Sequence, residues 1–124
     1  MKKNKFTKSV IIAINGIAHG VSKERNIKIQ IIIGLFIIFV SILLKIPKID
    51  FIVILLISFL VIILELINTS IEKLIDKLSP NFDKDYGKIK DIMAGVVLLS
   101  AILSVIIGLL LLFNPITSFI KGLF

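Results

Sequence analysis

The sequence predicts an all-α integral membrane protein, with an N-terminal amphipathic surface helix and three transmembrane helices. Hydrophobic residues make up 57% of the 124 residues, whereas soluble domains average about 45–50% apolar residues. The mean hydropathy is +1.09, and the apolar residues gather in three long runs. The formal charge is +7, but the basic residues flank these runs and form no continuous stripe with interleaved aromatics. This placement argues against a nucleic-acid partner and favours an anionic membrane face or an anionic soluble substrate.

The first element, at about residues 6–23, is expected to lie in the membrane interface. Val10, Ile14 and Ile17 recur at helical spacing on one side, while polar residues fall largely elsewhere. A short helix of this kind with polar flanks is typical of interfacial anchors. The same helix is also placed to act as a lid over a site, and the sequence leaves both interpretations open.

Three spanning helices follow, because each apolar run approaches the roughly 20 residues needed to cross the hydrocarbon. We expect residues 81–90 to form a polar loop before the last helix, and Asn114-Pro115 to end that helix. Gly34, Gly95 and Gly108 are expected to allow close helix packing. The whole chain, residues 1–124, is then one domain, with the predicted transmembrane helices at about residues 27–45, 50–78 and 88–113.

The distribution of basic residues predicts the orientation in the membrane. Twelve of the fifteen lysine and arginine residues lie in the N-terminal region and in residues 73–90, and the other three are Lys45, Lys48 and Lys121. Basic residues favour the cytoplasmic side. The N-terminus and the 73–90 segment should therefore face the cytoplasm.

A polar stripe continues from the second apolar run towards that cytoplasmic side. Glu65, Asn68, Glu72 and Asp76 follow one another at spacings of three, four and four residues, so they share one face of a helix with about 3.6 residues per turn. An ionisable group at mid-bilayer costs roughly 2.5–3.5 kcal/mol on insertion scales and by default indicates function. The shallower acids can also simply snorkel to water or pair with neighbouring lysines.

The residue types in this region suit phosphate chemistry. Glu24 precedes the first span on the same side of the membrane, and together with Glu72 it can bind magnesium, which prefers one or two carboxylates plus phosphate oxygens. Lys90 and Asp91 are expected to open the last helix, where a lysine and free backbone amides favour anions. Glu65 is about 10 Å deeper than Glu72, and its apolar surroundings should raise its affinity for a proton, which suits a general base.

This arrangement predicts transfer of a phosphoryl group from a soluble nucleotide to a membrane-embedded hydroxyl. Such a reaction depends mostly on positioning and charge neutralisation, so a small protein can perform it. The sequence has no GxxxxGK[ST], GxGxxG, HRD or DFG motif, which excludes the common soluble kinase architectures. Two rival functions stay open, namely a small proton-coupled transporter that uses Glu65 and a holin-like pore.

Three stretches of the sequence resemble the small prokaryotic diacylglycerol kinase family. They read KERN at residues 23–26, ELINTSIEKLID at residues 65–76 and KIKDIMAG at residues 88–95. The middle stretch, E-x-x-N-[ST]-[AS]-I-E-x-x-x-D, is the most specific of the three. The KERN stretch is similar to the undecaprenol kinase branch of this family.

The resemblance implies a homotrimer whose active sites are shared between neighbouring subunits. It also implies that ATP is the phosphate donor and that a divalent cation, magnesium, is required. By motif match, Glu65 is the catalytic base and contacts the lipid, Asn68 supports the catalytic site, and Glu24 and Glu72 hold the metal with the nucleotide phosphates. Further nucleotide contacts are implied for Lys90 and Asp91, with weaker matches at Asn81, Phe82, Asp83 and Lys8. Ala94 is implied to lie beside the lipid head.

We therefore expect an ATP- and magnesium-dependent lipid kinase of the bacterial cytoplasmic membrane. The expected reaction converts undecaprenol to undecaprenyl phosphate. The alternative within the same family is conversion of diacylglycerol to phosphatidic acid, which the sequence separates poorly from the first.

Overall fold

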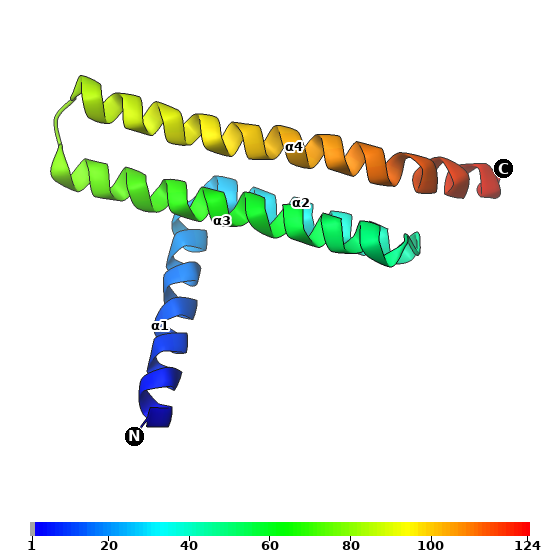
Figure 1. Ribbon diagram of the computed structural model, residues 1–124, viewed down its shortest axis with the longest axis horizontal. Helices are drawn as coiled ribbons and strands as arrows, with labels where there is room; N and C mark the ends of the chain where they lie inside the picture. The colour runs from blue at the N-terminus through cyan, green and yellow to red at the C-terminus, as the bar shows by residue number, and fades with distance from the viewer. Residues whose placement is uncertain (1) are drawn as a thin grey trace.

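The computed structural model describes residues 2–124, with side chains from residue 4 onwards, and the regular secondary structure in this part of the chain is entirely α-helical. Figure 1 shows α2, α3 and α4 running alongside one another, while α1 projects crosswise from them. The all-α architecture expected from the sequence is confirmed. The four helices are α1 (Lys2–Lys23), α2 (Arg25–Leu43), α3 (Lys48–Leu78) and α4 (Lys84–Leu123).

Three of the helices, α2, α3 and α4, are long and apolar enough to cross a membrane. Large apolar side chains such as Phe36, Phe59 and Leu110 are exposed along them, as expected for surfaces that face hydrocarbon instead of water. The buried apolar residues lie mainly on α3, at Ile54, Ile57, Val61 and Ile75. Because α3 contacts each of the other three helices, it is the element that positions the polar residues described below.

The turn between α2 and α3 closes without a glycine. Lys45 has a positive φ of 51°, its amide donates to the Ile42 carbonyl at 3.1 Å, and the next amide, of Ile46, donates to the Ser41 carbonyl at 3.4 Å. These two bonds form a Schellman motif, which satisfies carbonyls left free at the helix end. Pro47 then caps α3, so the two helices return antiparallel after a very short connection.

The last helix begins earlier and ends later than the sequence predicted. Asp83 caps it by accepting hydrogen bonds from the amides of Asp85 and Tyr86 at 2.9 and 3.2 Å, so the helix starts within the expected loop. At the other end, α4 continues through Pro115. Proline removes one backbone donor, so the carbonyl of Leu111, four residues earlier, loses its donor within the helix, a defect that membrane helices tolerate. The nearby Thr117 Oγ1 donates to a different carbonyl, that of Asn114, at 3.0 Å.

The closest approach between helices at a glycine is at Gly20, at the end of α1. A Cβ placed on Gly20 would lie 2.7 Å from Cδ2 of Leu66 on α3, which is closer than van der Waals contact allows. The glycines expected to allow close packing have more room, since a Cβ at Gly34 would make an ordinary contact with Ser58 and one at Gly95 or Gly108 would meet nothing within 4 Å. A side chain at Gly20 would therefore have to displace either the end of the Leu66 side chain or α1 itself.

Replacing Gly20 with leucine is expected to displace α1 from α3, whereas the same change at Gly16 should not. A Cβ at Gly16 meets nothing within 4 Å, and both substitutions raise helix propensity by a similar amount, up to about 1 kcal/mol. The chain has no cysteine, so spin labels can be placed at Ser9→Cys and Ser118→Cys and their distance distribution measured. Equal distributions in the two leucine variants would contradict the role of Gly20.

Candidate active site

The polar stripe on α3, comprising Glu65, Asn68, Glu72 and Asp76, passes from a buried to an exposed environment. Glu65 and Asn68 are only 3% and 7% exposed, Glu72 is half-buried and Asp76 is exposed. Asn68 Nδ2 donates to Glu72 Oε1 at 3.3 Å, so the amide orients the next acid along the stripe. We call this set the acidic stripe.

Glu24 joins the acidic stripe from the start of α2. It occupies the N-cap position in an extended conformation, but its side chain makes no capping hydrogen bond. The carboxylates of Glu24 and Glu72 both interact electrostatically with Glu65. The fold thus brings Glu24 near two carboxylates of α3 that follow it by more than 40 positions in the sequence.

Within residues 4–124, none of these three carboxylates forms an ion pair. The ion pair in this part of the chain joins Lys90 and Asp76. Like charges held together away from water are unfavourable unless a cation compensates them. No group of three or more histidine or acidic side chains among the described residues is arranged to hold a metal by itself. Magnesium usually binds one or two carboxylates together with substrate phosphates, and the pair Glu24 and Glu72 fits that requirement.

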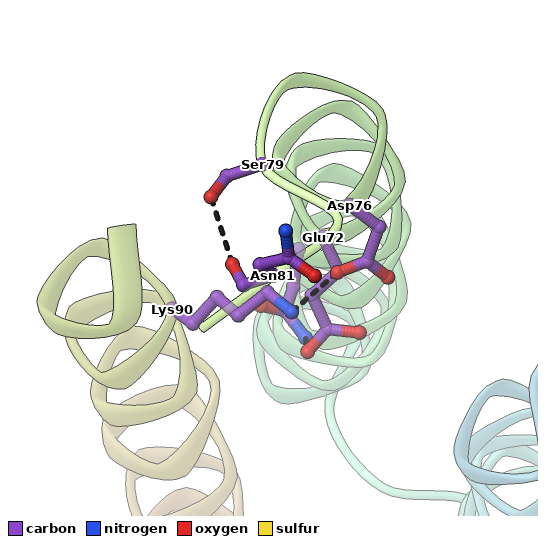
Figure 2. A network of polar contacts seen from close by, with 6 residues as sticks. Glu72, Asp76, Ser79, Asn81 and Lys90 are labelled. Carbon is purple, nitrogen blue, oxygen red and sulfur yellow. Dashed lines mark hydrogen bonds and ion pairs between the residues drawn. The ribbon is translucent and has the colours of Figure 1, made fainter. Parts of the chain in front are cut away.

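A lysine from α4 closes the exposed end of the acidic stripe. Lys90 Nζ donates to Asp76 Oδ1 at 2.5 Å, and Figure 2 shows its side chain reaching from α4 towards α3, where Glu72 lies near the pair. Lys90 is in the second turn of α4, because the helix begins at Lys84. The helix-start amides expected at Lys90 and Asp91 are therefore at residues 84–87 instead, where those of Asp85, Tyr86 and Gly87 are already bonded to Asp83. At Lys90 only the side-chain charge is available to an anion.

The remaining predicted site residues lie around this mouth or away from it. Asp91 and Ala94 are exposed on α4, and Ala94 shares a face with Lys90 because it follows four residues later. Lys8 is exposed on α1, about 18 Å along that helix from Gly20 at 1.5 Å per residue. Since α1 points away from the other helices (Figure 1), Lys8 does not reach the acidic stripe of its own chain.

The segment between α3 and α4 is occupied by local hydrogen bonds. The Asp83 carboxylate caps α4, and the Asn81 carbonyl accepts a bond from Ser79 Oγ at 2.9 Å (Figure 2). The ring of Phe82 is 93% exposed. Asp83 thus has a clear structural role, and nucleotide contacts by these three residues stay a prediction.

A cavity of about 570 Å³ begins close to the acidic stripe and opens between α2, α3 and α4. Its wall includes Val61, which lies one helical turn before Glu65 on the same face of α3. From there the lining is almost wholly apolar, with small residues such as Gly34, Ser58 and Gly108 leaving the space. The buried Glu65 therefore lies one helical turn beyond the wall of an apolar cavity suited to hydrocarbon.

One buried residue beside the acidic stripe, Thr69, has no role predicted from the sequence. Thr69 is 4% exposed, and its Oγ1 atom has no hydrogen-bond partner. The signal that could have found it is its spacing, four residues after Glu65 and three before Glu72, which puts it on the same face of α3.

The model of one protein family, described as prokaryotic diacylglycerol kinase, matches residues 11–112. The chain belongs to the prokaryotic diacylglycerol kinase family. The matched region contains Glu24, the whole acidic stripe and the part of α4 that carries Lys90 and Asp91. Membership of this family of lipid kinases confirms the resemblance noted in the sequence.

Two relatives of this protein carry names that specify different lipids, diacylglycerol and undecaprenol. A Synechocystis sp. protein named diacylglycerol kinase is 38% identical over 104 residues, which are 83% of this chain and 59% of that protein. A Bacillus subtilis protein named undecaprenol kinase is 32% identical over 108 residues, which are 87% of this chain and 88% of that protein. The chain thus spans little more than half of the first relative and most of the second.

Proposed function

We propose that this protein is an ATP- and magnesium-dependent kinase that phosphorylates undecaprenol to undecaprenyl phosphate. The observation that carries the proposal is the acidic stripe, which leads from a buried glutamate beside an apolar cavity to an exposed mouth with a lysine. Undecaprenol is favoured because the relative named undecaprenol kinase matches this chain over 88% of its own length. Diacylglycerol is the second candidate, supported by the higher identity of 38% to the relative named diacylglycerol kinase.

In the proposed reaction, the lipid hydroxyl lies against the Glu65 carboxylate at the end of the cavity. Glu65 accepts the hydroxyl proton as the alcohol oxygen forms a bond to the γ-phosphorus of ATP. The bond between that phosphorus and the β–γ bridging oxygen breaks, and ADP leaves with the electron pair. Burial of Glu65 keeps bulk water from competing with the alcohol for the phosphoryl group.

The charged mouth is proposed to hold the nucleotide. Glu24 and Glu72 would hold a magnesium ion together with the phosphates, where the ion supplies neutralisation of phosphate charge. Asn68 keeps Glu72 oriented through its hydrogen bond. Lys90 would release Asp76 and bind a phosphate oxygen in its place. Asp91 and the segment Asn81-Phe82-Asp83 would border the nucleotide.

We further propose that the active form is a homotrimer with sites shared between subunits. Lys8 lies on α1, which points away from the acidic stripe of its own chain (Figure 1), so a nucleotide contact by Lys8 requires the site of a neighbour. The exposed apolar faces of α2 and α4 offer surfaces for such an assembly as well as for lipid.

The proposed location is the bacterial cytoplasmic membrane, with the N-terminus and the active site facing the cytoplasm. The excess of basic residues in the N-terminal region and residues 73–90 supports this orientation. It also places the mouth of the acidic stripe where ATP is available. The lipid head would then lie between Glu65 and Ala94, with its chain in the cavity.

The proposal is tested by phosphate transfer in reconstituted bilayers. Purified protein is given radiolabelled ATP with undecaprenol, diacylglycerol or no added alcohol, each with and without magnesium. We expect labelled undecaprenyl phosphate as the main product, formed only with magnesium. Faster labelling of diacylglycerol would change the substrate assignment, and no labelled lipid with any alcohol would favour the transporter or the pore.

A further inference from the structure

The hydroxyl of Thr69 differs from the other helical hydroxyls whose hydrogen bonds are defined. Seven serine and threonine side chains in the helices donate to the backbone carbonyl three or four residues earlier, namely those of Ser9, Ser22, Ser41, Ser70, Ser100, Ser104 and Thr117. Thr69 Oγ1 makes no such bond, although the residue is 4% exposed. A buried donor that bonds neither backbone nor side chain is unusual in a folded protein.

Thr69 lies at the border between two faces of α3. It shares one face with Glu65 and Glu72, from which it is separated by four and three residues. On its other side, Leu66 and Lys73 contact α1, through Gly20 and through a 3.1 Å approach of Lys73 Nζ to His19 Nε2. The hydroxyl is therefore held where the end of α1 meets the acidic stripe.

A second free polar atom lies next to it. Asn68 Oδ1 is buried without a partner, while the Nδ2 atom of the same amide is occupied by Glu72. Asn68 and Thr69 follow Glu65 by three and four residues, so they flank its face one turn nearer the mouth. One free acceptor and one free donor at the same depth are the groups that a polar ligand would satisfy.

The depth of Thr69 indicates which part of a ligand it meets. At 1.5 Å per residue it lies about 6 Å from Glu65 and about 4.5 Å from Glu72 along the helix axis. In the proposed function the alcohol oxygen is at Glu65 and the nucleotide phosphates are at Glu72. The group that passes between these two levels is the γ-phosphoryl group.

We propose that Thr69 is a further catalytic residue, whose hydroxyl donates a hydrogen bond to a non-bridging oxygen of the phosphoryl group in transfer. This inference rests on the proposed kinase function. As the alcohol oxygen bonds to phosphorus and the bridging oxygen departs with ADP, charge spreads over the non-bridging oxygens. A donor already fixed at that position stabilises this charge without rearranging.

The test is Thr69→Val, which removes the hydroxyl and keeps the shape of the side chain, together with Thr69→Ser, which keeps the hydroxyl. We expect Thr69→Val to lower kcat by about 10-fold or more, with smaller changes in the KM values for lipid and ATP. Its thermal stability should be equal to or above that of the wild type, because the hydroxyl has no partner to lose in the free protein. Thr69→Ser should recover most of the kcat.

Ser70→Ala is the matched control. Ser70 is the next residue on the same helix, but it is exposed and its hydroxyl is bonded to the Leu66 carbonyl at 2.9 Å. Its loss should leave kcat within about twofold of the wild type. The comparison separates the effect of the Thr69 position from a general effect of removing a hydroxyl from α3.

Three results would overturn the inference while leaving the kinase function intact. One is an unchanged kcat in Thr69→Val, and another is a fall in activity that only follows a fall in stability. The third is a loss with diacylglycerol but not with undecaprenol, since that would place the hydroxyl on a lipid ester and not on the phosphoryl group. A wild-type protein that phosphorylates no alcohol would instead refute the proposed function, and this inference with it.

Discussion

Replacing Glu65 with glutamine is expected to lower the kcat for lipid phosphorylation by about 100-fold or more, the usual range for loss of a general base. Glutamine keeps the size and most of the hydrogen bonding of the side chain but cannot accept the hydroxyl proton. Because Glu65 is buried and interacts with two other carboxylates, removing its charge should not destabilise the fold. The measurements are initial rates in bilayers and thermal unfolding in detergent.

Asp50→Asn provides the matched control for this prediction. Asp50 lies in the first turn of the same helix, at the end opposite to the acidic stripe, so its loss should leave kcat unchanged. A Glu65→Gln protein that retains most of the wild-type rate would remove Glu65 from the role of base. A protein that loses activity together with its thermal transition would show a structural role instead.

Replacing Glu72 with glutamine is expected to raise the magnesium concentration needed for half-maximal rate by about 10-fold or more, since even outer-shell changes at metal sites commonly weaken binding 10–100-fold. The amide removes one of two proposed carboxylate ligands, while the Asn68 bond to Oε1 can persist with a glutamine oxygen. The measurement is a titration of initial rate against magnesium at fixed ATP. Glu24→Gln should shift the curve in the same direction.

Asp85→Asn is the control for the magnesium titration. Asp85 is an exposed acid in the first turn of α4, and its backbone amide, not its carboxylate, takes part in the cap. The rate of the Asp85→Asn protein should depend on magnesium concentration in the same way as the rate of the wild type. If Glu72→Gln lowered the rate by the same factor at every magnesium concentration, Glu72 would not be a ligand of the metal.

Much of the fold was predictable because it depends on patterns within single helices. The length and hydropathy of the apolar runs predicted three spanning helices, and the structure contains three helices of that kind. The same patterns failed at the ends of α4. There the start depends on one carboxylate that caps two amides, and the helix continues through Pro115 within a stretch that is apolar on both sides.

The candidate site shows the same division between local and distant residues. Spacing alone places Glu65, Asn68, Glu72 and Asp76 on one face, and the contact between Asn68 and Glu72 follows from it. The importance of Gly20 was not predictable, because its neighbour Leu66 lies 46 positions away in the sequence. The free hydroxyl of Thr69 was not predictable either, since a threonine in a helix normally bonds its own backbone.

The sequence by itself determined the membrane class, the number of spanning helices and the acidic stripe, because each follows from residue spacing along one continuous helix. Only the tertiary structure decided that Glu24 joins the stripe, that Lys90 pairs with Asp76 and that α1 ends against Leu66. These contacts join residues on different helices. Their geometry depends on how the helices pack against one another, which no periodicity within a single helix specifies.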